Sequence, residues 1–281
     1  MANKLSEYVK DNHQQAIHED QSLPVIDQIR RFLSKHKQVY VEEKIDGERV
    51  FLVVNEERSM LATKHNGIYS ANELPLLFAD VHVKPRAVID CELKRKEQRL
   101  DCFDILFSEG KDVRACPLSE RKAHLSSAFA NCEVEHVRNM SFFVSGDADE
   151  ILRMFDETTE SGGEGLMLKD VNARYKSTNG WLKLKAWATV DAFVIALVQN
   201  EKDVSYSIAV HDAQGKLVPL GDVYSAILGV DVSQIIVGTV LEVRHQPSAG
   251  FRALRHPTIM KIRTDKTPEE CLFDQLGTES K

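Results

Sequence analysis

A lysine followed closely by an Asp-Gly pair is the first feature of this sequence that could do chemistry. Residues 44–49 read Lys-Ile-Asp-Gly-Glu-Arg, which fits the pattern K-x-D-G-x-R. A lysine amine attacks phosphorus only when it is neutral, and desolvation or nearby cations can lower a lysine pKa enough to allow that. The carboxylate of Asp46 follows Lys44 by two residues, and Gly47 gives the backbone a freedom that a side chain would restrict. The segment predicts a nucleophilic lysine or, as the ordinary alternative, a lysine before a hairpin turn.

Strands are expected on both sides of this lysine, over residues 38–43 and 49–54. Residues two apart in a strand point to the same face of a sheet, so Glu42 and Lys44 should face one pocket.

Pairs of charged residues recur at the ends of later strands. Asp90 and Glu92 lie two apart near the end of an expected strand over 86–93. Their carboxylates could bind a ribose hydroxyl or magnesium, or they could simply be exposed at a strand end. Glu164 and Lys169 stand at the two ends of an expected buried strand.

Two further strands carry residues that would suit a nucleotide. Phe103, within a mostly apolar strand over 99–106, is either a core residue or a ring stacked on a base. Residues 181–185 read Trp-Leu-Lys-Leu-Lys, which places Lys183 and Lys185 on one face and two leucines on the other. The strand is either a pair of phosphate clamps or an amphipathic strand with a solvated face.

Charge is unevenly distributed along the chain. The 281 residues are 43% hydrophobic, enough for one large domain or two ordinary ones, and the net charge is −7. Residues 251–266 nevertheless hold five cations against one acid, and residues 164–189 hold five against two. Local basic patches can bind phosphates on an acidic protein because screening confines the field to about 10 Å.

The sequence contains no feature typical of membrane or secreted proteins. It has no apolar run of about 18 residues, and its polar N-terminus has no apolar signal region. The five cysteines are scattered without CxxC pairs, which argues against a structural zinc site and a disulfide framework. We therefore expect a reduced, cytoplasmic protein.

The pattern of elements predicts an α+β first domain over 1–188 and a small β-barrel over 189–281. The expected helices cover 24–35, 117–130 and 147–159, and a further short strand covers 59–63. Strands at short intervals are expected over 190–198, 205–211, 216–220 and 238–245, with a helix between 222 and 228 and a poorly ordered tail after Cys271.

Taken in order, these blocks resemble the covalent nucleotidyltransferases, and specifically the ATP-dependent DNA ligases in a minimal two-domain form. The matching blocks are KIDGER at 44–49, DCEL at 90–93, FDIL at 103–106, EGLMLK at 164–169, WLKLK at 181–185 and a last motif from Arg255 to Lys266. The resemblance implies an ATP-grasp-like nucleotidyltransferase domain of antiparallel sheets and helices, followed by an OB-fold.

The resemblance also implies a role for each candidate residue. Lys44 would take AMP from ATP as a phosphoramidate, transfer it to a 5′-phosphate, and leave a 3′-hydroxyl to complete the sealing of nicked duplex DNA. The implied catalytic residues are Lys44, Asp46, Lys185, Arg263 and Lys266. The implied nucleotide-binding residues are Glu42 on the adenine, Phe103 stacked on it, Arg49 and Glu92 at the ribose and phosphate, and Lys183 and Lys185 on the α-phosphate. Glu92 and Glu164 would hold Mg²⁺ or Mn²⁺, and Arg263, Asp265 and Lys266 would orient pyrophosphate.

The sequence departs from the family pattern in two places. The usual Ser-Arg-x-Gly block is replaced by Thr63-Lys64-His65-Asn66-Gly67, where we assign Lys64 to the place of the arginine. Only 43 residues precede Lys44, too few for the helical DNA-binding domain of larger ligases. We expect a monomer that does not encircle a duplex unaided.

Other readings remain open at the level of sequence. An RNA ligase or an mRNA capping guanylyltransferase would share the lysine motif, whereas an NAD-dependent ligase would need an extra N-terminal domain. A non-catalytic OB-fold protein that binds single strands would leave the lysine constellation unexplained.

Overall fold

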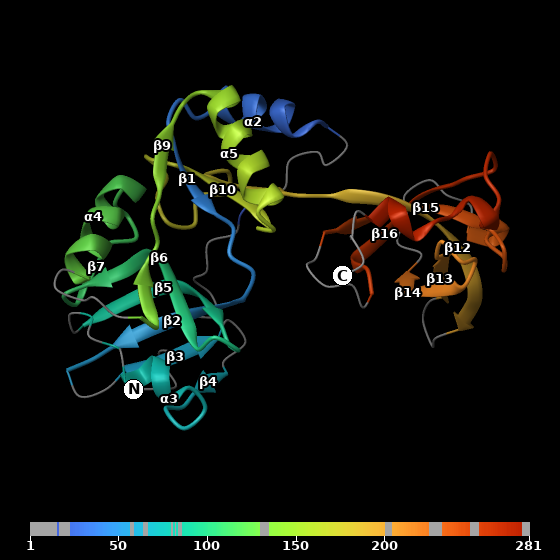
Figure 1. Ribbon diagram of the computed structural model, residues 1–281. Coiled ribbons are helices and arrows are strands. Elements are labelled where there is room, and N and C mark those ends of the chain that lie inside the picture. Colours follow the sequence, from blue (N-terminus) through green and yellow to red (C-terminus); the bar gives the residue numbers. More distant parts are fainter. Residues whose placement is uncertain are drawn as a thin grey trace. The chain divides into compact units, whose positions relative to one another are not determined.

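The computed structural model describes residues 16, 23–56, 59–63, 67–79, 81, 83, 86–129, 135–199, 204–224, 232–247 and 253–276. The chain divides into two compact units, Met1–Leu184 and Lys185–Lys281, coloured along the sequence in Figure 1. The division falls after residue 184 rather than after residue 188 as expected from sequence. In the described ranges, no helix is both long and apolar enough to cross a membrane.

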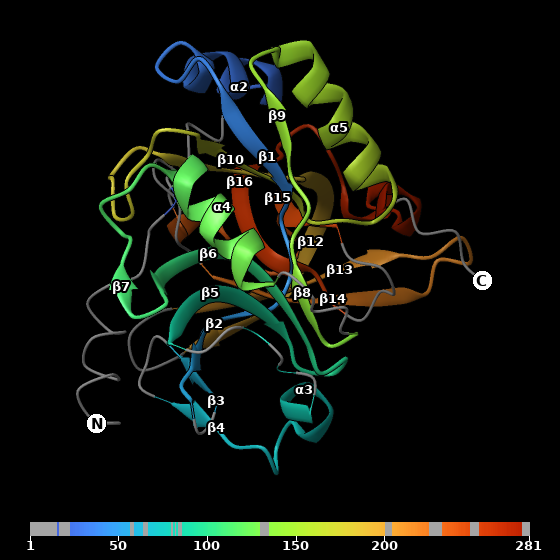
Figure 2. The same ribbon diagram turned by 90° about the vertical axis from the view of Figure 1, so that its left-hand side faces the viewer.

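A four-stranded sheet forms one part of the first unit. Its strand order is β11-β10-β1-β9, and β1 pairs antiparallel with both β10 and β9. The strands are β1 (Val39–Glu43), β9 (Phe143–Ser145), β10 (Gly165–Asp170) and β11 (Trp181–Lys185). Helices α2 (Val25–Leu33) and α5 (Ala148–Glu160) lie side by side next to it (Figure 2). The Asp147 side chain caps α5 by accepting the backbone N–H groups of Asp149 and Glu150.

A seven-stranded sheet forms the other part of the first unit. Its order is β4-β3-β2-β5-β6-β7, with β8 parallel to β6 and the other pairs antiparallel. The strands are β2 (Glu48–Val54), β3 (Ser59–Thr63), β4 (Ile68–Tyr69), β5 (Ala87–Lys94), β6 (Arg99–Ser108), β7 (Lys111–Asp112) and β8 (Val137–Asn139). Helices α3 (Pro75–Ala79) and α4 (Leu118–Ala128) contribute Leu77 and Leu125 to its core.

The segment after Lys44 is not a hairpin turn, because β1 and β2 belong to different sheets. The Lys44 N–H donates to the Gly165 carbonyl at 2.9 Å, so pairing with β10 continues to the lysine. At Gly47 a Cβ would lie 2.7 Å from the Leu93 carbonyl oxygen, which leaves no room for a side chain. The chain therefore passes from one sheet to the other directly beside Lys44.

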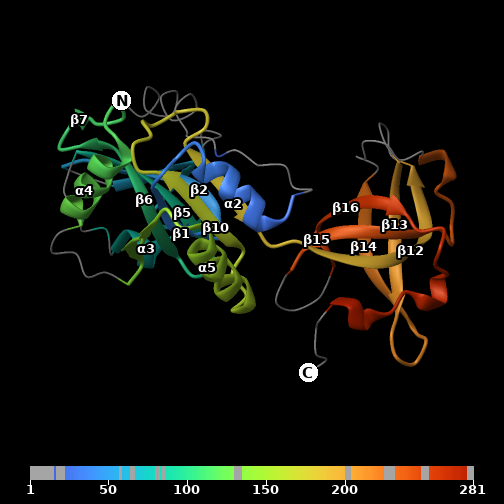
Figure 3. The same ribbon diagram turned by 90° about the horizontal axis from the view of Figure 1, so that it is seen from above.

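The second unit is a five-stranded antiparallel sheet in the order β14-β13-β12-β15-β16 (Figure 3). The strands are β12 (Ala188–Gln199), β13 (Val204–His211), β14 (Leu217–Tyr224), β15 (Val240–Gln246) and β16 (Arg255–Ile262). The Leu254 N–H donates to the Leu220 carbonyl at 2.9 Å, which links β14 to the start of β16 although these strands are the two edges of the sheet.

Two sequence predictions for this unit are wrong in the residues that the structure describes. The residues from Asp222 to Tyr224 end β14 instead of starting a helix, because they pair with β13; residues 225–228 lie outside the described residues. The tail is ordered as far as it is described, since Phe273–Leu276 forms a 3₁₀ helix that packs Phe273 and Leu276 against the core.

Candidate active site

Lys44 contacts one carboxylate in the first unit and acts electrostatically on a second. Its ammonium forms an ion pair with Glu164, which directly precedes β10. Glu92, on β5, is close enough for the charges of Lys44 and Glu164 to act on it. Burial raises the pKa of Glu92 to about 7, and the cations Lys44 and Arg49 only partly oppose that rise. The structure thus brings together Lys44, Glu92 and Glu164, which lie far apart in the sequence.

Arg49 is fixed by a buried carboxylate beside two aromatic rings. Its guanidinium donates to both oxygens of Asp90, at 2.9 and 2.5 Å, and Asp90 is fully buried. The Tyr175 hydroxyl donates to the same carboxylate at 2.7 Å. The guanidinium carbon lies 5.6 Å from the Phe103 ring centroid and 5.7 Å from that of Trp181. Burial alone would lower the pKa of Arg49, but Asp90 reverses the effect and raises it, so the guanidinium stays charged.

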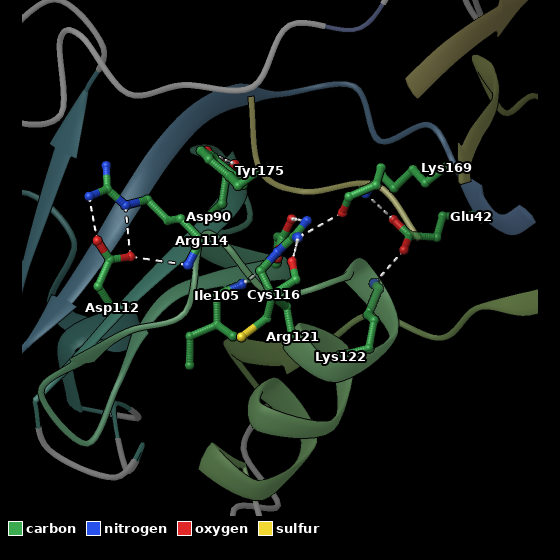
Figure 4. A network of polar contacts seen from close by, with 12 residues as sticks. Glu42, Asp90, Ile105, Asp112, Arg114, Cys116, Arg121, Lys122, Lys169 and Tyr175 are labelled. Atoms are coloured by element: carbon green, nitrogen blue, oxygen red, sulfur yellow. Dashed lines mark hydrogen bonds and ion pairs between the residues drawn. The ribbon is translucent and has the colours of Figure 1, made fainter. Parts of the chain in front are cut away.

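The sequence spacing predicts that Glu42 and Lys44 face one pocket, but the ion pairs of Glu42 are with other residues than those of Lys44. Its carboxylate is buried and forms ion pairs with Lys122 of α4 and Lys169 of β10 (Figure 4). Burial opposes ionisation of Glu42, but the charges of the two lysines lower its pKa below the usual value. The Lys169 ammonium lies 4.4 Å from the Phe103 ring centroid and 4.2 Å from that of Trp181, which connects this cluster to Arg49.

A fully buried ion pair holds α4 against the seven-stranded sheet. Arg121 donates to Asp104 of β6 at 2.8 and 2.9 Å, and both side chains have no exposed surface. Arg121 also donates to the backbone carbonyls of Cys116 and Ala173, at 2.7 and 2.9 Å. These four hydrogen bonds hold Arg121, and the next residue of α4 is Lys122.

The strand β11 alternates as predicted. Leu182 and Leu184 are buried, while Lys183 and Lys185 are partly exposed on the other face. Phe103, which was assigned either to the core or to a base, is buried and packs edge-on to Trp181, with ring centroids 6.0 Å apart.

The second unit has its own charged cluster, built around Asp191 of β12. Arg263 donates to this carboxylate at 3.0 and 3.1 Å, and Lys266 donates to it at 2.5 Å. Arg263 also pairs with Asp265 at 2.8 Å. The hydrogen bond from Arg263 lowers the pKa of Asp265, and the bond to Asp191 raises the pKa of Lys266.

The remaining candidates are placed as follows. Asp46 is exposed on the crossover between the sheets, and Lys64 lies outside the described residues. Among the described residues, no group of three or more His, Cys, Asp or Glu side chains could hold a metal by itself. Sequence reasoning missed Lys122, Arg121 and Tyr175, because nothing in a helix or loop sequence marks these polar residues as buried.

Comparisons with known proteins agree with the sequence resemblance. Residues 68–185 match the family model described as ATP dependent DNA ligase domain. The chain is 27% identical to the DNA ligase of Thermococcus fumicolans over 64% of its length, and 27% identical to a probable DNA ligase of Opitutus terrae over 85% of its length. It covers only 38% and 32% of those two proteins.

Solved structures share the fold. One is a Lig E DNA ligase studied for DNA binding with a minimal scaffold, with a TM-score of 0.65 and 19% identity, covering 90% of this chain and 99% of that one. The ligase domain of LigD from M. tuberculosis has a TM-score of 0.51 and 18% identity, covering 93% of this chain and 98% of that one.

Proposed function

We propose that this chain, a relative of the ATP-dependent DNA ligases, uses ATP to seal nicks between a 5′-phosphate and a 3′-hydroxyl in duplex DNA. The observation that carries the proposal is the position of Lys44. Lys44 lies where the chain passes from one sheet to the other, and its ammonium forms an ion pair with Glu164. Its charge also acts on the Glu92 carboxylate. A lysine that attacks a triphosphate needs a defined position next to groups that can accept its proton or bind a metal ion.

The first step joins AMP to the protein. The neutral amine of Lys44 attacks the α-phosphorus of ATP, a P–N bond forms, and the P–O bond to pyrophosphate breaks. Glu164 accepts a hydrogen bond from the Lys44 ammonium. This carboxylate can therefore take the proton that Lys44 loses. An oxygen of the DNA 5′-phosphate then attacks the AMP phosphorus, which breaks the P–N bond and frees Lys44. Attack by the 3′-hydroxyl on the 5′-phosphorus breaks the bond to AMP, releases AMP and closes the strand.

Two groups of charged residues near the Phe103 ring would hold the nucleotide. One contains Glu42 and Lys169, and the other contains Arg49 and Asp90. We assign the adenine to Glu42 and the Phe103 ring, and the ribose and phosphates to Arg49 and Glu92. Arg49 suits this task because Asp90 keeps its guanidinium charged and holds it beside the rings of Phe103 and Trp181. Lys183, Lys185 and Lys64 complete the expected phosphate contacts.

A divalent cation fits the donor set of the site. Mg²⁺ usually binds one or two protein carboxylates and completes its coordination with water and substrate phosphates. Glu92 and Glu164 supply two carboxylates that act on each other electrostatically, and these two residues would hold such an ion. When bound, such an ion would neutralise charge on the phosphates.

For the second unit we propose an OB-fold, supported by its five-stranded antiparallel sheet and by the hydrogen bond that links its two edges. We assign Arg263 and Lys266 to the leaving pyrophosphate in the first step, with Asp265 orienting Arg263. In this assignment the second unit acts on the nucleotide in the first step, as closing domains commonly do in enzymes.

The decisive experiment is covalent labelling. Incubation with ATP labelled at the α-phosphate and magnesium, followed by denaturing electrophoresis, should give an acid-labile band, and mass spectrometry should find AMP on Lys44. The variant Lys44→Arg should give no band, because a guanidinium stays protonated. AMP on any other residue would overturn the assignment.

Substrate choice separates the related activities. Labelling with GTP in place of ATP would indicate a capping enzyme, and preference for nicked RNA over nicked DNA would indicate an RNA ligase.

A further inference from the structure

Lys122 is buried in a place where a lysine is costly. Its side chain is 2% exposed, and its ammonium lies between the Glu42 carboxylate and the face of the Phe142 ring, 5.1 Å from the ring centroid. Taking a cation out of water is unfavourable unless it is paired. Arg121 already anchors α4 to β6 through a fully buried ion pair, so the helix does not depend on Lys122 alone. The ion pair of Lys122 with Glu42 is an additional contact, made to β1.

The two lysines contact Glu42 in different ways. Lys169 makes a hydrogen bond to Oε2 of the carboxylate. Lys122 forms an ion pair with Oε1, but neither Oε1 nor the Lys122 ammonium, both buried, has a hydrogen-bond partner of regular geometry. A buried carboxylate oxygen that has an ion pair but no regular hydrogen bond is uncommon, and it keeps the capacity to accept one from a ligand.

The chemistry of this oxygen selects one kind of ligand. An ionised carboxylate only accepts hydrogen bonds, so Oε1 would favour an N–H donor. A 6-amino group on a purine supplies such a donor, whereas a 6-oxo group would place one acceptor against another. Leaving a buried acceptor facing another acceptor costs binding, and this is how sites reject a near-isosteric competitor.

We propose that Lys122 is a positioning residue that sets the base selectivity of the nucleotide site, by holding Oε1 of Glu42 ionised, immobile and able to accept a hydrogen bond from a 6-amino group. The proposal rests on the proposed function, in which Glu42 meets the adenine. Lys122 itself touches no substrate. Its ion pair keeps the carboxylate charged without using up the acceptor oxygen, while Lys169 fixes the other oxygen.

Removing this lysine should change selectivity more than turnover. In Lys122→Met, Glu42 keeps only Lys169, so the carboxylate can turn toward that lysine and Oε1 no longer holds its position. Loss of one charge-assisted hydrogen bond corresponds to about 10-fold or more in binding. We expect the KM for ATP to rise by about that factor and kcat for self-adenylation to stay within about threefold.

The test compares three nucleotides on full-length protein. Rates of adduct formation are measured against concentration for ATP, for inosine triphosphate with its 6-oxo group, and for purine riboside triphosphate with no 6-substituent. Wild-type protein should prefer ATP over both analogues. Lys122→Met should lose about 10-fold of that preference, Lys122→Arg should recover part of it, and the exposed control Lys111→Met should behave as wild type.

Each outcome decides a different point. If wild-type protein forms no adduct with any nucleotide, the proposed function fails. If it does, but Lys122→Met keeps the wild-type KM and preference for ATP, the inference fails. A kcat that falls equally for all three nucleotides, with preference intact, would assign Lys122 a purely structural role and also overturn the inference.

A second variant keeps the test open if Lys122→Met does not fold. Phe142 is 41% exposed, so Phe142→Leu removes the ring behind the Lys122 ammonium without opening the core. A cation–π contact is weaker than an ion pair. We therefore expect the same change in selectivity at a smaller size, about two- to fivefold, and an unchanged preference for ATP would count against the proposal.

Discussion

The two units contain the same arrangement of charges in different surroundings. In the first unit one carboxylate, Glu42, receives two lysines, and all three side chains are buried. In the second unit one carboxylate, Asp191, receives Arg263 and Lys266, whose side chains are 17% and 29% exposed.

The two arrangements shift lysine pKa values in opposite directions. Burial lowers the pKa of Lys169 to about 8, although Glu42 pulls it upward. The hydrogen bond to Asp191 raises the pKa of Lys266. The ion pair is similar in both, so the difference comes from water: where solvent is excluded, desolvation outweighs pairing, and where solvent remains, pairing dominates.

The largest expected effect comes from removing the two carboxylates. Glu42→Leu leaves Lys122 and Lys169 buried and unpaired, which should lower the free energy of unfolding by about 3–5 kcal/mol. Asp191→Leu should cost far less, because Arg263 keeps Asp265 and Glu242 as partners. Native-state amide exchange in β1 and β10, compared with exchange in β12 and β15, measures each unit separately. Equal losses of stability in the two variants would contradict the difference that we infer between the buried and the exposed cluster.

The next effect concerns reaction steps. Arg263→Ala should slow self-adenylation by about 100-fold, a typical result of removing one electrostatic contact to a reacting group. It should largely spare the sealing of a nick that is supplied already adenylated, since no pyrophosphate remains to be oriented. Lys44→Ala is the matched control, because it should abolish adduct formation and retain part of the final step. If Arg263→Ala impaired both steps equally, the exposed cluster would have a general structural role.

A smaller effect is a dependence of stability on pH. Native Lys169 loses its proton near pH 8, whereas an unfolded lysine keeps it to about pH 10.5. The unfolded state therefore binds more protons between these values, and the free energy of unfolding should rise with pH across this window. Urea unfolding between pH 7.5 and 9.5 measures the rise. In Lys169→Met the rise should be smaller, and identical slopes in both proteins would show that Lys169 does not titrate in this range.

The smallest effect is on salt dependence. Lys261 lies in the basic stretch of the second unit with 57% of its side chain exposed, paired only at the surface with Glu242. If this stretch follows DNA phosphates, Lys261→Gln should lower the slope of log binding constant against log salt by about 1. Lys216→Gln, in the turn before β14, is the control and should leave the slope unchanged. Titration of a nicked duplex at several salt concentrations gives both slopes.

Much of the sheet structure could be predicted from the sequence. The strands ending or beginning near Lys44, and those over 59–63 and 181–185, were located to within about a residue, because their β-branched and alternating residues have a clear period. The short strands β4, β7, β8 and β9 were missed, because two or three residues are too few to show an alternating pattern.

The candidate site was predictable only where it depends on local spacing. The alternation of lysines and leucines in β11 follows from two-residue periodicity. The partners of Glu42 could not be found this way. One lies on a helix 80 positions away (122 against 42) and the other on a strand 127 positions away (169 against 42), and burial of either depends on tertiary packing. The hairpin alternative at Lys44 failed for the same reason, because the neighbour of β1 is β10 rather than β2.

The crossover at Lys44 also sets an order of events during synthesis on the ribosome. Six strands of the seven-stranded sheet come from residues 48–112 and can pair as soon as that stretch has emerged. Strand β1 must wait for β9 and β10, more than 90 residues later in the chain, before it has any neighbour. Lys44 and Glu42 therefore meet Glu164 and Lys169 only after most of the first unit has been translated. A nascent chain shorter than this would lack the assembled nucleotide site proposed above.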